Sequence, residues 1–234
     1  MARGWHLRWI MVLGVLPLVG AWLAWLLWQS RGEAGRRGAD RAGYFAGVAG
    51  LFTQGVTRVE LTGFGRLAGV WQGLRHDLQA VPDTLSYRKL PVLWVLVTQT
   101  EAVPVATELH IMARPTEHEV FSSFGAMAAA VALPAGFPAD CALRCADASA
   151  LPPEALIART AALFADPRVK EVVIAPKGLR IVILAEEAAR AGYLLFRNAE
   201  MGRAALTPAR LQPVLDALAV LRKDVLAVME SGDV

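Results

Sequence analysis

Twenty consecutive residues near the start of the chain carry no charged or strongly polar side chain. The run reads WIMVLGVLPLVGAWLAWLLW and extends from Trp9 to Trp28. As an α-helix rising about 1.5 Å per residue it would span about 30 Å, which matches the hydrocarbon core of a bilayer. Only a helix satisfies the backbone of a single segment in lipid. The run therefore predicts a transmembrane helix over residues 9–28.

Five residues of this run are predicted to anchor it. Trp9 lies at one end and Trp25 and Trp28 at the other, where aromatic side chains favour the membrane–water interface, and Trp22 adds to the second group. Pro17 removes one hydrogen bond of the helix and predicts a kink near its middle. The lipid bilayer is thus the first partner that the sequence predicts.

A cleaved signal peptide is the main alternative to an anchor. Val19 and Ala21 have the small side chains that precede a cleavage site. Cleavage after Ala21 would release a periplasmic protein, but it would leave AWLAWLLW as a hydrophobic N-terminus in water. This cost favours the uncleaved anchor.

Basic residues flank the run and bear on its orientation. The predicted topology determinants follow it, at Arg31, Arg36, Arg37 and Arg41. Arg3 and Arg8 precede it. The excess of arginine on the C-terminal side, about one charge, favours the cytoplasmic face of a bacterial inner membrane for the body of the protein, whereas an ordinary uncleaved signal-anchor would place the body outside.

The net charge of +3 is concentrated in this N-terminal part. Residues 1–42 have a balance of +4, and the remaining residues a balance of −1. Proteins that bind nucleic acids normally carry excess Lys and Arg on the folded domain. The sequence therefore predicts no nucleic-acid partner.

The rest of the chain reads as one folded domain. We expect an N-terminal flank over residues 1–8, an Arg- and Gly-rich linker over 29–43, a domain over 44–230 and a short tail over 231–234. Alternating or apolar stretches predict strands, and amphipathic or Ala-rich stretches predict helices. The strands are expected at 56–61, 70–81, 91–99, 105–113, 142–146, 169–174 and 179–184, and the helices at 117–132, 152–164 and 207–229.

This order predicts an α+β fold class. The N-terminal transmembrane helix would be followed by one antiparallel or mixed sheet, with helices packed on one face.

Few residues are candidates for catalysis or for binding a metal or cofactor. His76, Asp77 and His110 are the weak catalytic candidates, and His110 could meet His76 across a sheet. His76 and Asp77 are neighbours on an expected strand, so their side chains should point to opposite faces. Cys141 and Cys145 are expected to be buried on a strand, too far apart for a disulfide bond with each other. The sequence predicts no metal and no cofactor.

Three short segments resemble a loosely defined class of uncharacterised bacterial single-span membrane-anchored proteins. The segments are the Gly-spaced hairpin from Gly63-Phe64-Gly65 to Gly73, the turn Leu133-Pro134-Ala135-Gly136, and Phe137-Pro138-Ala139-Asp140-Cys141. The resemblance implies a C-terminal α+β domain and no established activity, substrate or cofactor.

An anchor joined to an ordered domain without a catalytic signature predicts a binding or scaffolding module. Its partner would be another membrane protein or a second copy of the chain. The alternative is a membrane-anchored hydrolase or ligand-binding enzyme that uses His76, Asp77 and His110, for which the three side chains must converge.

Overall fold

A computed structural model of the chain describes residues 3–84, 90–116, 118–188, 190 and 201–231. The chain divides into two compact units, residues 1–39 and residues 40–234. The first unit consists of most of helix α1 (Arg3–Ala42), and the second contains all the strands.

Helix α1 continues through the segment that was expected to be a linker. Its side chains are described from Leu18 onward, except that of residue 27. Arg, Glu and Asp side chains follow Trp28 along the helix.

Within the described residues, no helix combines the length and the apolar character that crossing a membrane requires. The prediction of a single-pass transmembrane helix is therefore wrong, and so is the location in a bacterial inner membrane that was inferred from it. The proposed roles of Arg31, Arg36, Arg37 and Arg41 in topology stay predictions. Trp9 and Pro17 lie where side chains are not described.

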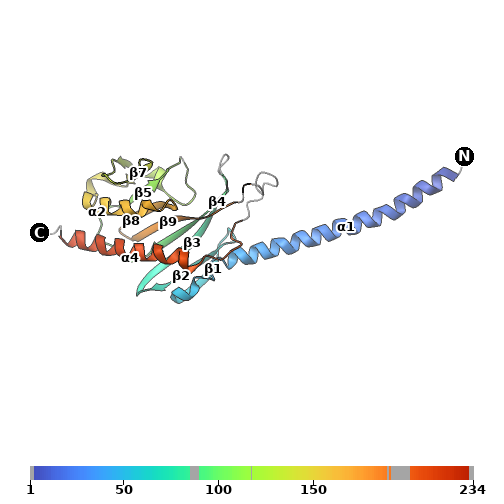
Figure 1. The fold of residues 1–234 in the computed structure, drawn as a ribbon, viewed down its shortest axis with the longest axis horizontal. Helices are drawn as coiled ribbons and strands as arrows, with labels where there is room; N and C mark the ends of the chain where they lie inside the picture. The colour runs from blue at the N-terminus through green and yellow to red at the C-terminus, as the bar shows by residue number, and fades with distance from the viewer. Residues whose placement is uncertain (1–2, 85–89, 117, 189, 191–200, 232–234) are drawn as a thin grey trace. The chain divides into compact units, whose positions relative to one another are not determined.

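The second unit is built on one nine-stranded sheet (Figure 1). The strands are β1 (Thr53–Val59), β2 (Gly65–Trp71), β3 (Leu74–Asp83), β4 (Val92–Gln99), β5 (Leu109–Ala113), β6 (Ala129–Val131), β7 (Cys141–Cys145), β8 (Val169–Ala175) and β9 (Gly178–Glu187). They lie in the order β1-β2-β3-β4-β9-β8-β5-β7-β6, and every neighbouring pair is antiparallel.

The predicted fold class is corrected accordingly. The described chain is a large antiparallel sheet with few helices, rather than an α+β domain behind a transmembrane helix. The strands near 91–99, 142–146, 169–174 and 179–184 were predicted close to their positions. The stretch 70–81 instead contains a hairpin, because Gln72 and Gly73 both adopt positive φ values, as a two-residue type I′ turn requires.

One face of the sheet, which we call the helix face, holds the main core. Alternate residues such as Leu78, Val97 and Ile181 are buried there in register with one another. Two helices cover this face, α2 (Glu154–Arg159) and α4 (Pro208–Ser231) (Figure 1). The apolar side of α4 packs there, through Leu211, Leu215, Leu218, Leu221 and Val225.

The other face of the sheet, which we call the opposite face, has a smaller core. Leu96, Met112 and Val182 lie on it and pack against Phe121 and Phe124. Both phenylalanines come from residues 118–126, which we call the cover segment. The helix expected over 117–132 is not formed in the described part, which contains only a single 3-10 turn (Phe124–Ala126) and strand β6. Tertiary contacts of the cover segment override its modest helix propensity.

Candidate functional site

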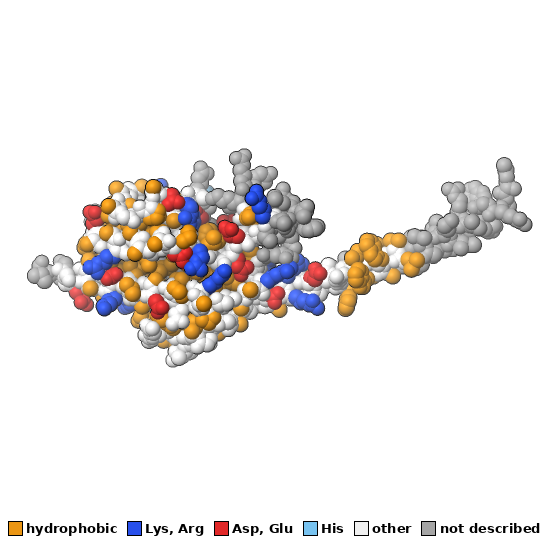
Figure 2. Space-filling model, in the orientation of Figure 1, with side chains coloured by type: hydrophobic (Ala, Val, Ile, Leu, Met, Phe, Trp, Pro, Cys, Tyr) orange, Lys and Arg blue, Asp and Glu red, His pale blue; other side chains and the backbone are white. Residues whose placement is uncertain are grey.

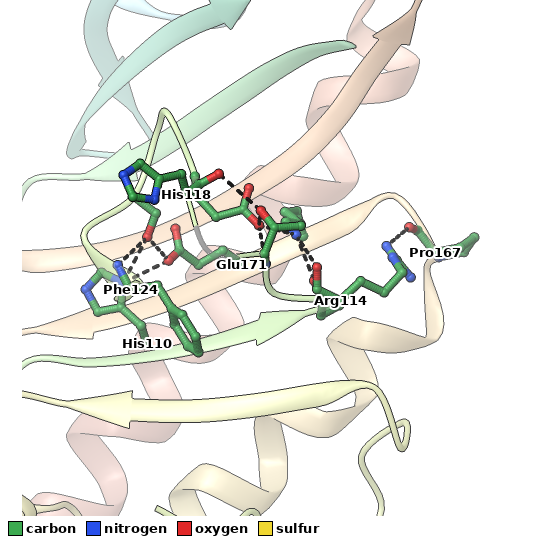
Figure 3. Close-up of polar contacts among 11 residues, drawn as sticks. His110, Arg114, His118, Phe124, Pro167 and Glu171 are labelled. Atoms are coloured by element: carbon green, nitrogen blue, oxygen red, sulfur yellow. Dashed lines mark hydrogen bonds and ion pairs between the residues drawn. The ribbon is translucent and has the colours of Figure 1, made fainter. Parts of the chain in front are cut away.

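A cluster of ionisable side chains lies under the cover segment on the opposite face (Figure 3). Strands β5 and β8 pair with Met112 opposite Glu171, so that His110 and Glu171 project from the same face. A bulge between Val169 and Glu171 inserts Lys170 into β8. Lys170 and Glu171 are consecutive, and both are buried. Successive side chains of a regular strand point to opposite faces, so a sheet that is covered on one face would bury only one of the two.

Carboxylates flank both ring nitrogens of His110. Nδ1 lies 2.8 Å from Oε1 of Glu171, and Nε2 lies 2.7 Å from Oε1 of Glu108. The side chain of Glu171 is fully buried, whereas that of Glu108 is 42% exposed. A hydrogen-bonded chain therefore leads from the surface at Glu108 to the interior at Glu171.

Ser122 joins the cover segment to this chain. Its hydroxyl donates to Oε1 of Glu171 and accepts the backbone N–H of Phe124 at 3.0 Å. The same oxygen is 3.4 Å from Nδ1 of His110. Ser122 thus ties the backbone of the cover segment to the buried carboxylate.

A buried ion pair holds the cover segment at a second point. Nζ of Lys170 lies 2.8 Å from Oε1 of Glu119, and each of these side chains is only 5% exposed. The ammonium group also donates to the carbonyl oxygens of Ala113 and Arg114 and lies 5.9 Å from the centre of the Trp94 ring. Buried charges are tolerated when they are paired and hydrogen-bonded in this way.

The environment of His110 favours its charged form. Burial disfavours the imidazolium, but the hydrogen bonds and charges of Glu171 and Glu108 together outweigh burial and raise the pKa of His110 above its ordinary value. A protonated ring can donate to both carboxylates at once, whereas a neutral ring can donate to only one.

The cluster contains serine, histidine and a carboxylate but lacks the geometry of a catalytic triad. In a triad the serine contacts one ring nitrogen and the acid orients the other. Here Ser122 and Glu171 both lie on the Nδ1 side, Glu108 occupies Nε2, and Ser122 donates to the acid. His110 and Glu171 are also buried from any substrate. The arrangement fastens the cover segment to the sheet.

The remaining catalytic candidates lie elsewhere, on β3. The sheet order places four strand spacings between β3 and β5, or about 19 Å at about 4.8 Å per spacing. His76, Asp77 and His110 therefore do not converge. The hydrolase hypothesis required that convergence.

His76 is buried in an aromatic environment on the helix face. Its Nδ1–H donates to the carbonyl oxygen of Leu74 at 2.9 Å, and the rings of Phe52 and Trp71 lie near its own ring. Burial lowers the pKa of His76, more than the hydrogen bond to Leu74 raises it. A neutral, enclosed imidazole in this setting has a structural role.

Asp77 projects from the opposite face, as expected for the neighbour of His76 on a strand. It accepts two hydrogen bonds of 2.7 Å from the guanidinium group of Arg66. The pair lies beside a shallow pocket of about 400 Å³, whose lining also includes Gln54, Arg75 and Thr100. Because each arginine at the pocket already has an acidic partner, the pocket offers no uncompensated charge to a ligand.

The two cysteines lie on β7, and both are free thiols. Their side chains share one face of the strand. Burial raises the pKa of both thiols, and the nearby carboxylates Asp140 and Asp147 add to that effect. Raised thiol pKa values disfavour the reactive thiolate.

The predicted anchor residues are placed only in part. Trp22, Trp25 and Trp28 are described and are 58%, 52% and 75% exposed on α1. Apolar side chains gather on one part of the described helix, and charged side chains lie on the rest (Figure 2). Arg41, in the second unit, lies over the ring of Phe64 at 5.4 Å. This cation–π contact gives Arg41 a packing role within the folded domain.

A feature that sequence reasoning missed is the free edge of the sheet at β1. All seven residues of β1 are exposed, whereas most residues of strands β2 to β9 are buried or half-buried. Val56 is 65% and Val59 60% exposed, and Leu61 beyond the strand is fully exposed. The sequence predicted a strand here, but nothing in a single strand's residues shows whether it lies at an edge.

Comparison with protein-family models, curated proteins and solved structures found no match to this chain.

Proposed function

We propose that the domain is a binding or scaffolding module that engages an extended protein segment along the free edge of β1. The observation that carries this proposal is the full exposure of β1. An edge strand presents unpaired N–H and C=O groups that can add a further strand.

The composition of β1 supports the proposal. Sheets commonly protect an edge with proline, lysine, an inward-pointing charge or a bulge, and the irregularity in the pairing of β1 with β2 lies between Thr53 and Val56. The strand TQGVTRV has no proline and no lysine, and its single charge, on Arg58, is directed to solvent. Val56 and Val59 project from the two different faces of the strand, so an added strand would find apolar contacts on both sides.

The site chemistry supports the same conclusion. The buried cluster around His110 and Glu171 fastens the cover segment, and the pocket beside Asp77 is electrostatically balanced. The exposed valines on the β1 edge therefore remain as the described feature of the sheet that a partner could cover.

Site-specific photo-crosslinking in living cells tests the proposal. A photo-reactive amino acid at Val59 of the full chain should give a discrete adduct with a protein. Val220 of α4 is the matched control, since it is also an exposed valine, at 61%. Thr57→Pro, which removes an N–H from the free edge, should abolish the adduct. A Val59 probe that yields no adduct beyond the Val220 background would refute the proposal.

A further inference from the structure

The backbone of β1 determines how a strand can be added to it. Glu60 donates its N–H to the carbonyl oxygen of Phe64 at 2.9 Å, so its backbone faces β2. Hydrogen bonding alternates along an antiparallel strand, and the register from Val56 to Val59 is regular. Arg58 and Val56 therefore also face β2, and the N–H and C=O groups of Thr57 and Val59 face the free edge.

The charges near this edge are arranged for pairing with a copy of the same strand. Arg58 and Glu60 are two residues apart, so their side chains project from the same face, on either side of Val59. Their side chains already meet within the chain, with Nε of Arg58 3.1 Å from Oε1 of Glu60. A two-fold axis at Val59 would exchange these positions between two chains.

We propose that the segment docked on β1 is β1 of a second copy, paired antiparallel about a two-fold axis at Val59. This inference rests on the proposed function and names its partner. In this register Val59 lies opposite Val59 of the second copy, and each Arg58 lies opposite a Glu60. The outward-facing N–H and C=O groups of the two Val59 residues bond to each other. The two sheets become continuous.

The neighbouring registers are less favourable. An axis at Arg58 would place two guanidinium groups directly opposite each other, which is destabilising. An axis at Thr57 would place Arg58 opposite Val56 and leave both charges without a partner on the second copy, although Glu60 would keep its ion pair with Arg66 of β2. Of these three registers, only the one with its axis at Val59 places two pairs of opposite charges across the contact and no pair of like charges. A two-fold contact of this kind is self-complementary and closes at a dimer.

Charge reversal tests both the partner and the register. The full chain should sediment as a dimer in a concentration-dependent equilibrium. Arg58→Glu places acid opposite acid and Glu60→Arg places base opposite base, and each should weaken dimerisation by about tenfold or more. Mixing the two variants should restore dimers, since every cross-strand pair is then complementary. Circular dichroism confirms that each variant is folded.

A cysteine cross-link provides an independent measurement. Val59→Cys should form a covalent dimer on mild oxidation, whereas Val220→Cys and the unsubstituted chain, which retains Cys141 and Cys145, should not. A chain that stays monomeric, or a dimer indifferent to both charge reversals, would overturn the inference. If the Val59 photo-adduct forms but contains a different protein, the proposed function stands and the second copy is ruled out as its partner.

Discussion

The side chains of His110 and Glu171 meet across strands β5 and β8, with Nδ1 and Oε1 2.8 Å apart and both groups shielded from solvent. The contact joins two strands that are distant in sequence, and Ser122 extends it to the cover segment. The protonation state of His110 therefore affects how firmly the cover segment is held.

The stability of the fold should decrease at alkaline pH because of His110. Its pKa is raised in the folded state, so the folded chain holds this proton more tightly than the unfolded chain. The stabilisation is fully present below the ordinary histidine pKa of about 6.5 and is lost as pH rises through the raised folded value. One proton limits the slope to about 1.4 kcal/mol per pH unit. Urea unfolding against pH should show the decline, and His110→Asn should remove it.

His76 should give the opposite dependence on pH. Burial lowers its pKa, so the unfolded chain binds the proton more tightly than the folded chain. The stabilisation from neutral His76 is present above about pH 6.5 and is lost as pH falls through the lowered folded value. His76→Phe should reduce the loss on the acid side. An NMR titration that found the midpoint of His76 above that of His110 would contradict at least one of the two assignments.

The sequence predicted much of the sheet but, of the buried cluster, singled out only His110. Hydrophobic patterning located β4, β8 and β9, because a buried strand must be apolar whatever its neighbours are. The order of the strands, and with it the meeting of His110 with Glu171, depends on pairings between distant segments. His76 and His110 each fit a strand pattern, and no local signal shows that four strand spacings separate them.

The N-terminal run and the cover segment show two other limits of sequence patterns. The composition of the apolar run predicted a membrane-spanning helix that ends at Trp28 and is followed by a linker. The helix α1 instead extends without interruption to Ala42. The Ala-rich stretch indicated a helix, but Ser122 bonds to Glu171 and to the N–H of Phe124 and so favours a turn. Serine commonly competes with helical hydrogen bonding in this way.

Removal of the Ser122 hydroxyl should destabilise the fold. Ser122→Ala deletes the acceptor of the Phe124 N–H and a donor to the buried Glu171, at a cost of about 1–3 kcal/mol. Ser123→Ala is the matched control, because Ser123 is exposed and makes no capping hydrogen bond, so its effect should stay within about 0.5 kcal/mol. Equal unfolding free energies for the two variants would show that the Ser122 hydroxyl contributes nothing to holding the cover segment.

Neutralisation of Glu119 should cost more than neutralisation of a surface acid. Glu119→Gln keeps an oxygen for the N–H of Thr116 but removes the negative charge that pairs with the buried ammonium of Lys170, a loss of about 3–5 kcal/mol. Asp224→Asn breaks the ion pair with Arg159, whose side chain is 52% exposed, and should cost less than about 1 kcal/mol. Thermal unfolding of both variants checks this ranking, and a reversed order would contradict the buried pairing.

Alanine at Gly178 should be far more damaging than alanine at Gly73. Both glycines have positive φ values, of 145° and 80°, and each lies at a two-residue hairpin turn. A Cβ atom at Gly73 would meet nothing within 4 Å, so Gly73→Ala should lower the free energy of unfolding only by the backbone strain, about 1 kcal/mol. A Cβ atom at Gly178 would overlap the carbonyl oxygen of Gln99 on β4, which adds a steric clash to the strain. We expect Gly178→Ala to cost about 3 kcal/mol or more, because β4 and β9 must then separate at the centre of the sheet. Urea unfolding of the two variants measures the difference, and similar midpoints would contradict the close approach of Gly178 to Gln99.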